Sequence, residues 1–324
     1  MYNKIGLEEH FAIPETIGDS THYFVGGATN LKTQRLLDLF DMRLEQMDQY
    51  GMDIMILSLN SPAIQSICDR QEAAKICRLA NEALADAIQK HPTRFRGFAA
   101  LPLQDVDLAC EELHYCVEEL GFVGVLANGY SQIDTPDNYL YLDDPIYRPF
   151  WAEMSKLDCP FYLHPREPMP ENNHVMDGHY WIHGAPWTFG VETASHALRL
   201  MCSGLFDEYP NLRILLGHLG ETLPFCIWRA QNHLNKRSRG IPVVRPILEV
   251  FNENFWVTTS GQFTLPPLLC TMAEMGVDRI MFATDYPFEE VSDACVWFDG
   301  LQISEADKKK IARDTAIDFF KLEL

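Results

Sequence analysis

Four side chains that could bind a metal stand at or near the ends of short apolar segments of this 324-residue sequence. They are Glu8, His10, His164 and Asp285. Two imidazoles and two carboxylates suit Zn²⁺, Mn²⁺ or Fe²⁺, and suit Ca²⁺ or a structural thiolate site poorly. A fold that brings these segments together therefore predicts a divalent metal site, with water or substrate completing the ligands.

The first of these segments, KIGLEEHF at 4–11, contains adjacent glutamates with different expected roles. Successive side chains of a strand point to opposite faces, so Glu8 and His10 should share one face and Glu9 the other. We expect Glu9 to face away from the metal and to have no special role.

Asp285 and three histidines have the strongest case for a role in the site. A carboxylate directly after an apolar strand, as Asp285 is in RIMFATDYP, is costly unless a cation accompanies it. His10, His164 and His218 each follow an apolar run, and Asn60, Asn128 and Ser260 end other such runs. We expect the remaining histidines to be structural or surface residues: His22, His91, His114, His174, His179, His183, His196 and His233.

The motif GHLGE at 217–221 places His218 after a strand and Glu221 at the start of the following helix. Arg229 lies eight residues beyond Glu221, two helical turns along the same face, and could pair with Glu221 to orient His218. An unrelated surface position is nearly as good an interpretation of Arg229 from the spacing alone.

The arrangement of apolar segments predicts an α/β fold, a (β/α)8 TIM barrel that forms a single domain over residues 1–324. Segments of helical period, such as QEAAKICRLANEALADAIQKH, separate the candidate strands. The C-terminal ends of all barrel strands meet at one face, where active sites lie. A doubly wound open sheet is the alternative, but the motifs GxGxxG and GxxxxGK[ST] are absent. The candidate strands are 4–10, 52–59, 95–102, 122–128, 160–165, 213–220, 255–261 and 279–287.

Two segments interrupt this alternation. Residues 166–187, rich in Pro, Gly and Trp, follow the fifth strand and are expected to form a long loop insertion over the barrel mouth. Residues 233–247 interrupt the sixth helical region. The fourth strand run, FVGVLAN, contains no lysine that could be carbamylated to bridge two metals, so one metal is expected.

Composition limits the partners. A formal net charge of −20 and a pI near 4.8 disfavour nucleic acid and anionic membrane surfaces. The nine cysteines include no C-x-x-C pair, which favours reduced core residues in a cytoplasmic protein. The N-terminus lacks the apolar run of a signal peptide, and no apolar stretch is long enough to span a membrane.

The sequence resembles the metal-dependent amidohydrolase superfamily, and within it the decarboxylases related to aminocarboxymuconate semialdehyde decarboxylase. The resemblance covers essentially the whole chain and rests on segments such as EEHFAIPE, FAALPLQD, FYLHPREP, LFDEYPNLRILLGHLGE and ATDYPFE. Some relatives have Ala where this chain has His10, so the E-x-H form is most similar to the members that act on 2,6-dihydroxybenzoate. Those members have DWPFE where this chain has DYPFE, an exchange that keeps the aspartate.

This resemblance implies reversible, non-oxidative decarboxylation of an ortho-hydroxybenzoate, with 2,6-dihydroxybenzoate expected first and salicylate or 2,3-dihydroxybenzoate as alternatives. It also implies one Mn²⁺ or Zn²⁺, no organic cofactor, and a homotetramer or homodimer. The implied residues are the metal ligands Glu8, His10, His164 and Asp285, the proton donor Asp285, the supporting residues His218, Glu221 and Arg229, and the pocket residues Asn128, Phe189 and His218.

Two other classes remain open at this stage. A hydrolase would use the same metal to activate water, with Asp285 as the base, against a lactone or amide. A non-catalytic binding protein would hold no metal. The role of Asp285 is also open, because a bound metal lowers the pKa of a carboxylate, whereas burial and a charged substrate raise it.

Overall fold

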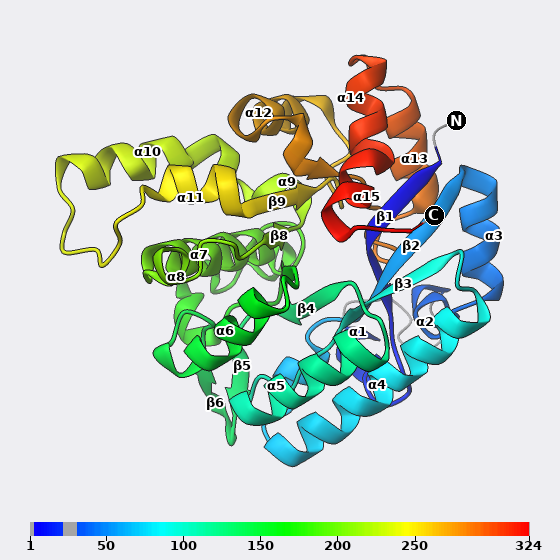
Figure 1. Ribbon diagram of the computed structural model, residues 1–324, viewed down its shortest axis with the longest axis horizontal. Coiled ribbons are helices and arrows are strands. Elements are labelled where there is room, and N and C mark those ends of the chain that lie inside the picture. The colour runs from blue at the N-terminus through cyan, green and yellow to red at the C-terminus, as the bar shows by residue number, and fades with distance from the viewer. Residues whose placement is uncertain (1–2, 22–30, 324) are drawn as a thin grey trace.

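The computed structural model describes residues 3–21 and 31–323, without the side chain of Thr21, and its centre is a sheet of eight parallel strands. Helices surround this sheet (Figure 1), and the predicted TIM barrel is confirmed. All eight predicted strands are present, and the strand order follows the chain. They are β1 (Lys4–Phe11), β2 (Met52–Leu59), β3 (Phe95–Ala99), β4 (Gly124–Asn128), β7 (Phe161–His164), β8 (Ile214–Leu216), β9 (Phe255–Thr258) and β10 (Ile280–Met281).

The barrel closes between its last and first strands. A parallel bridge joins Glu9 of β1 to Tyr286, beyond the end of β10, and the backbone N–H of His10 donates to the carbonyl of Tyr286 at 2.7 Å. Because β10 has only two residues, this closure lies in the irregular segment that follows it.

Two apolar layers hold the barrel together. The inner layer takes one or two buried side chains from each strand except β9, whose half-buried Trp256 packs against it, and continues into the C-terminal helix α15 (Thr315–Phe320). A second, larger layer fills the space between the strands and the surrounding helices. The inner side chains from the strands are Ile5, Leu7, Ile54, Ile56, Phe98, Leu126, Tyr162, Leu215 and Met281.

A bulge in β1 changes which residues face inward. The register against β2 shifts between Gly6 and Glu9. Leu7 belongs to the inner apolar layer, and the next residue, Glu8, also faces inward, where it meets Tyr162. The extra residue of a bulge produces this change of face.

The long helices follow the predicted patterns, with two differences. The run of helical period before β2, TQRLLDLFDMRLEQMDQYG, is divided, because the Asp38 side chain accepts the backbone N–H groups of Asp41 and Met42 and starts a new helix. Two other segments of helical period, DLACEELHYCVEELG and EADKKKIARDTAIDFFKLEL, each contain a π-helical turn, at Tyr115–Glu119 and Lys310–Asp314. The α-helices are α1 (Ile17–Thr21), α2 (Leu31–Leu37), α3 (Asp41–Tyr50), α4 (Arg70–Lys90), α5 (Val106–His114), α6 (Arg148–Lys156), α7 (Thr188–Cys202), α8 (Leu205–Glu208), α9 (His218–Glu221), α10 (Leu223–Lys236), α11 (Ile247–Asn254), α12 (Leu265–Met275), α13 (Val291–Asp299), α14 (Glu305–Lys309) and α15 (Thr315–Phe320).

Two further features lie outside the barrel strands. An antiparallel hairpin, β5 (Ser131–Ile133) and β6 (Thr135–Leu140), was not predicted. The segment between β7 and α7 contains three 3-10 helices, at Pro170–Asn172, His174–Met176 and Tyr180–Ile182. That this segment is an insertion over the barrel mouth stays a prediction. Among the described residues no helix has the length and apolarity that crossing a membrane requires.

Candidate metal centre

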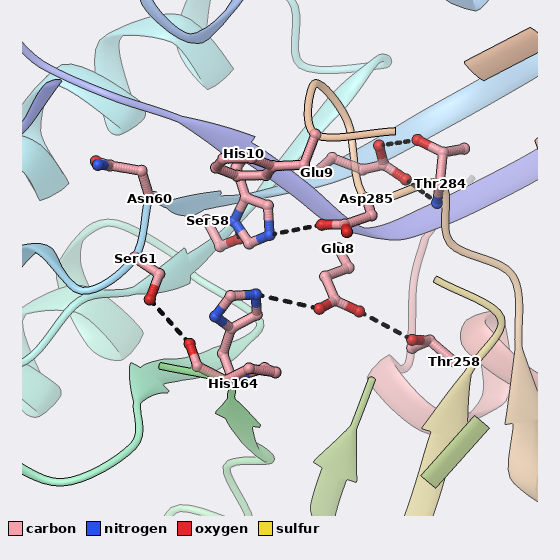
Figure 2. Close-up of polar contacts among 12 residues, drawn as sticks. Glu8, Glu9, His10, Ser58, Asn60, Ser61, His164, Thr258, Thr284 and Asp285 are labelled. Atoms are coloured by element: carbon pink, nitrogen blue, oxygen red, sulfur yellow. Dashed lines mark hydrogen bonds and ion pairs between the residues drawn. The ribbon is translucent and has the colours of Figure 1, made fainter. Parts of the chain in front are cut away.

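The barrel brings the four predicted metal ligands together at the C-terminal ends of its strands. Their donor atoms all lie within 4.8 Å of one another, and all four residues are buried. The Nε2 atom of His164 is 3.2 Å from Oε1 of Glu8, and that of His10 is 3.4 Å from Oδ1 of Asp285. Figure 2 shows these side chains pointing toward one another from strands β1 and β7 and from the segment after β10.

Two buried polar atoms of this group lack a hydrogen bond within the described part of the chain. They are Oε1 of Glu8 and Nε2 of His10. A buried polar atom without a hydrogen bond is costly, so a cation that binds both would remove the penalty. The atoms left over are those a metal would use, and the residues present therefore fit one divalent ion.

Neighbouring residues fix the ring orientation of both histidines. The Nδ1 atom of His164 is 2.8 Å from Oδ1 of Asn128, and Nδ1 of His10 is 3.1 Å from the hydroxyl of Ser58. Asn128 Oδ1 can only accept, so His164 carries its proton on Nδ1 and leaves Nε2 free to bind a metal. Asn128 thus lies behind a ligand, and its predicted contact with substrate stays a prediction.

Glu8 is fixed by its surroundings as well. Its Oε2 atom accepts hydrogen bonds from the hydroxyls of Tyr162 and Thr258, the latter at 3.1 Å. Gly217, which comes directly after β8, lies close to the Glu8 side chain. A Cβ at this position would lie 2.9 Å from both carboxylate oxygens of Glu8. A side chain at position 217 would therefore displace the Glu8 carboxylate.

His218 and Glu221 form a second pair beside the metal ligands. His218 Nδ1 is 2.6 Å from Glu221 Oε1, and its Nε2 is 3.8 Å from Oδ2 of Asp285. Both His218 and Glu221 have positive φ, so this part of α9 is a sharp turn that directs the two side chains into the site. Glu221 therefore lies where it can orient His218, and the supporting role of this pair in catalysis stays a prediction.

Arg229 does not take part in this pair. It lies exposed on α10, and within the described residues no ion pair joins it to Glu221. Glu221 holds the Nδ1 atom of His218 without Arg229, so the predicted pairing of Arg229 with Glu221 is absent from the described part of the chain. Any other role of Arg229 in the site stays a prediction.

The charges of the group favour ionised carboxylates. Burial alone would raise the pKa of Glu8, but His218, His164 and His10 hold it well below its ordinary value. Burial also acts to raise the pKa of Asp285, and His10 and His218 outweigh it, so that this pKa is lowered too. Burial lowers the pKa of His10, which favours the neutral imidazole that binds metals.

The pKa of His218 is shifted in the opposite direction. Burial lowers its pKa, but the carboxylates of Glu221, Glu8 and Asp285 outweigh burial and raise the pKa well above the ordinary value. These carboxylates therefore favour the protonated form of His218, which lies beside the Asp285 carboxylate. A proton and a carboxylate that can receive it lie next to each other.

A pocket of about 240 Å³ opens onto His218 and Asp285. Phe189, at the start of α7, lines this pocket, and its predicted contact with substrate stays a prediction. Gln262 and Glu289 also line it and were not predicted. Burial and the nearby Asp285 raise the pKa of Glu289. A volume of this size suits one small ring rather than a larger ligand.

The other described histidines outside the site lie on the surface or have structural partners. His22 falls outside the described residues. His196 is buried and its Nε2 accepts the backbone N–H of Leu142, and His114 pairs with Glu153 on the surface. Among the described histidines, only His10 and His164 belong to the four-residue metal group.

Glu9 differs from its expected description in one respect. Its side chain does face away from the metal group, but it is fully buried rather than solvated. Burial raises the pKa of Glu9 to about 8. Its carboxylate has both oxygens occupied by Thr284, the residue before Asp285.

The chain matches a known protein family over most of its length and a curated protein over all of it. Residues 33–322 match the amidohydrolase family. The sequence is 52% identical over 326 residues to a gamma-resorcylate decarboxylase of Rhizobium sp. (strain MTP-10005), covering 100% of this chain and 99% of that protein.

Solved structures agree in fold as well as in sequence. A crystal structure of 2,6-dihydroxybenzoate decarboxylase complexed with 2,6-dihydroxybenzoate matches with a TM-score of 0.97 and 52% identity, covering 99% of this chain and 100% of that chain. A dihydroxybenzoic acid decarboxylase from Polaromonas sp. JS666, with bound manganese and the inhibitor 2-nitroresorcinol, matches with a TM-score of 0.96 and 51% identity, covering 99% and 98%.

Proposed function

The chain belongs to the amidohydrolase family, and on this premise we propose that it is a metal-dependent decarboxylase that converts 2,6-dihydroxybenzoate (γ-resorcylate) into resorcinol and CO₂. The observation that carries the proposal is the buried group of two carboxylates and two imidazoles at the end of a small pocket. Gamma-resorcylate is the substrate named for relatives that align with this chain over its full length.

Glu8, His10, His164 and Asp285 would hold one divalent metal, Mn²⁺ or Zn²⁺, and no organic cofactor is needed. When bound, the metal neutralises the carboxylate and the phenolic oxygen of an ortho-hydroxybenzoate and so fixes the ring. This chain has a formal net charge of −20, so local positive charge is needed to attract an anionic substrate.

Asp285 is the proposed proton donor. It delivers a proton to the ring carbon that bears the carboxylate, after which the bond to the carboxylate breaks, its electron pair restores the aromatic ring, and CO₂ leaves. Without this proton the ring would be left as an aryl carbanion. The reverse sequence of steps carboxylates resorcinol.

The proton on Asp285 has a source in the site. The His218 imidazolium faces Asp285 at 3.8 Å and is itself held by Glu221. The negative charge of a bound substrate raises the pKa of Asp285 and so favours transfer of a proton to it. His218 supplies this proton, and Phe189 forms an apolar wall of the pocket that receives the ring.

The test is a product assay on the purified protein loaded with Mn²⁺. Supplied with 2,6-dihydroxybenzoate, it should release resorcinol and CO₂ in equal amounts, and turnover on 2,3-dihydroxybenzoate and salicylate should be lower. The same protein stripped of metal by a chelator is the control and should be inactive until Mn²⁺ is restored. Cleavage of a lactone without release of CO₂ would instead favour the hydrolase.

The assembly and location follow from other features. We propose a homodimer or homotetramer, because α10 exposes the large apolar side chains of Phe225 and Trp228, 86% and 62% accessible. We propose a cytoplasmic location, because all nine cysteines are free thiols, as expected in a reducing compartment.

A further inference from the structure

The seam that closes the barrel has little regular hydrogen bonding. In the described part of the chain, β1 and the segment after β10 share one backbone bridge, at Glu9 and Tyr286, with the hydrogen bond from the His10 N–H. Asp285 lies in this seam, one residue before Tyr286. A residue that must bind a metal and deliver a proton is therefore held by an irregular segment.

The Glu9 side chain supplies the missing contacts. One carboxylate oxygen accepts the backbone N–H of Thr284 at 2.9 Å, and the other accepts the Thr284 hydroxyl at 2.5 Å. Both residues are fully buried. Figure 2 shows the two bonds on the side of β1 opposite Glu8 and His10.

These contacts determine the direction in which Asp285 points. Glu9 holds Thr284 and the His10 N–H holds Tyr286, so Asp285 is fixed on both sides. Asp285 itself has a φ of +64°, a conformation that non-glycine residues adopt at a cost and keep only where their surroundings impose it. With this backbone its carboxylate turns back toward the Nε2 atoms of His10 and His218.

The surroundings of Glu9 are adapted to a buried carboxylate. Residue 6 is glycine, and a Cβ there would overlap the Glu9 carboxylate. Arg43, also fully buried, donates to the His10 carbonyl at 2.6 Å and lies 4.6 Å from the centre of the Tyr286 ring. Its positive charge offsets part of the cost of burying Glu9.

We propose that Glu9 is a positioning residue, which through Thr284 holds the Asp285 carboxylate in the metal group. This inference rests on the proposed function, because it concerns the same metal and the same proton donor. Glu9 itself touches neither. Groups that support metal ligands in this way typically contribute about 10- to 100-fold in metal affinity or activity.

The test compares substitutions that remove the contact with substitutions that retain it. Thr284→Val removes the hydroxyl and keeps the shape of the side chain, and Glu9→Ala removes the carboxylate. Each should lower the affinity of the apoprotein for Mn²⁺ about 10-fold, lower kcat by a similar factor with KM nearly unchanged, and alter the electron paramagnetic resonance spectrum of bound Mn²⁺. Thr284→Ser and Glu9→Gln, which can still hydrogen bond, should remain within about 3-fold of the wild type in Mn²⁺ affinity.

Asp299→Asn is the matched control at the other end of β1. It weakens the 3.0 Å ion pair with the buried Lys4 and should lower the melting temperature without changing Mn²⁺ affinity or spectrum. Wild-type Mn²⁺ affinity and spectrum in Thr284→Val would overturn the proposal, and so would an equal loss of affinity in Asp299→Asn. If Glu9→Ala does not fold, Thr284→Val decides. A wild-type protein that binds Mn²⁺ and releases no CO₂ would count against the proposed function alone, because the Mn²⁺ titration does not depend on the reaction.

Discussion

At the scale of single residues, the metal group depends on side chains that never reach the metal. Asn128 and Ser58 hold the Nδ1 atoms of His164 and His10, so both Nε2 atoms face the same space. Buried histidines without these partners could rotate or change tautomer. The metal affinity of the site therefore depends partly on neutral side chains of β4 and β2.

Replacing Asn128 tests this dependence. Asn128→Ala leaves the Nδ1–H of His164 without its acceptor, and we expect the Mn²⁺ affinity to fall about 10- to 100-fold. Titration of the apoprotein with Mn²⁺ measures it. Asn138→Ala, which removes an exposed side chain that donates to the Ile133 carbonyl, is the control and should bind Mn²⁺ normally. Unchanged affinity in Asn128→Ala would mean that the backbone alone orients His164.

Asp285 is proposed to be both a metal ligand and the proton donor, and one substitution separates the two roles. Asp285→Asn keeps an oxygen that can bind a metal but cannot deliver a carboxylic acid proton. Release of CO₂ should fall at least about 10³-fold while the protein still purifies with metal, since general acids typically contribute about 10²- to 10⁴-fold. Product release and elemental analysis of the same sample provide both readouts. A variant with near-normal turnover would remove Asp285 as the donor.

The metal ligands could be predicted because each ends a recognisable apolar strand and because the sequence resembles a known family. The basis of the prediction at β1 was incomplete, however. Simple alternation correctly separated Glu8 and His10 from Glu9, yet it would also put Leu7 on the face opposite Glu8. In the structure a bulge brings both Leu7 and Glu8 inward. A bulge depends on pairing with β2, which one strand's sequence does not encode.

At the scale of elements, the long apolar strands were predictable and the short polar ones were not. Except for β1, which extends one residue further to Phe11, every barrel strand falls within its predicted range, because buried parallel strands are continuous apolar runs. The hairpin of β5 and β6 was missed because β6 reads TPDNYL, a sequence with turn residues and little apolar periodicity. The π-helical turns were missed because they preserve the apolar pattern of a helix.

His196 on α7 makes the stability of this element sensitive to acid. Burial, with the nearby Arg199, lowers its pKa to about 3. Below the ordinary histidine pKa of about 6.5 the unfolded chain binds a proton that the folded chain does not, so stability falls as the pH decreases from about 6.5 toward 3. At pH 5 the loss from this one residue is about 2 kcal/mol.

The comparison that isolates this effect is His196→Gln, which can still accept the N–H of Leu142. Denaturant unfolding at pH 7 and pH 5 should show a smaller acid-induced loss in the variant than in the wild type, by about 2 kcal/mol. His91→Gln, a partly exposed histidine at the end of α4, is the control and should behave like the wild type. If all three proteins lost the same free energy of unfolding between pH 7 and pH 5, His196 would not be the cause of the acid sensitivity.

At the scale of the whole molecule, the negative net charge of the chain opposes the binding of an anionic substrate. The chain is strongly acidic overall, whereas its catalytic pocket is proposed to receive an anion. A bound metal and the His218 imidazolium are the local cations that make this possible.

Phe225, Trp228 and Arg229 all lie on α10, which together with α11 extends to one side of the barrel in Figure 1.

The exposed apolar side chains of α10 predict how the chain assembles. Phe225 and Trp228 are three residues apart and so lie on one face of the helix. Burial of such large side chains favours contact with a second copy of the chain. At micromolar concentration we expect a mass of at least two chains by light scattering. The double variant Phe225→Ser and Trp228→Ser should have the mass of one chain under the same conditions, because the apolar contact is lost.

Val296→Ser replaces a side chain of similar exposure, 68%, on α13 and should leave the mass unchanged. A wild type that is monomeric throughout, or a double variant with an undiminished mass, would show that this face of α10 does not assemble the protein.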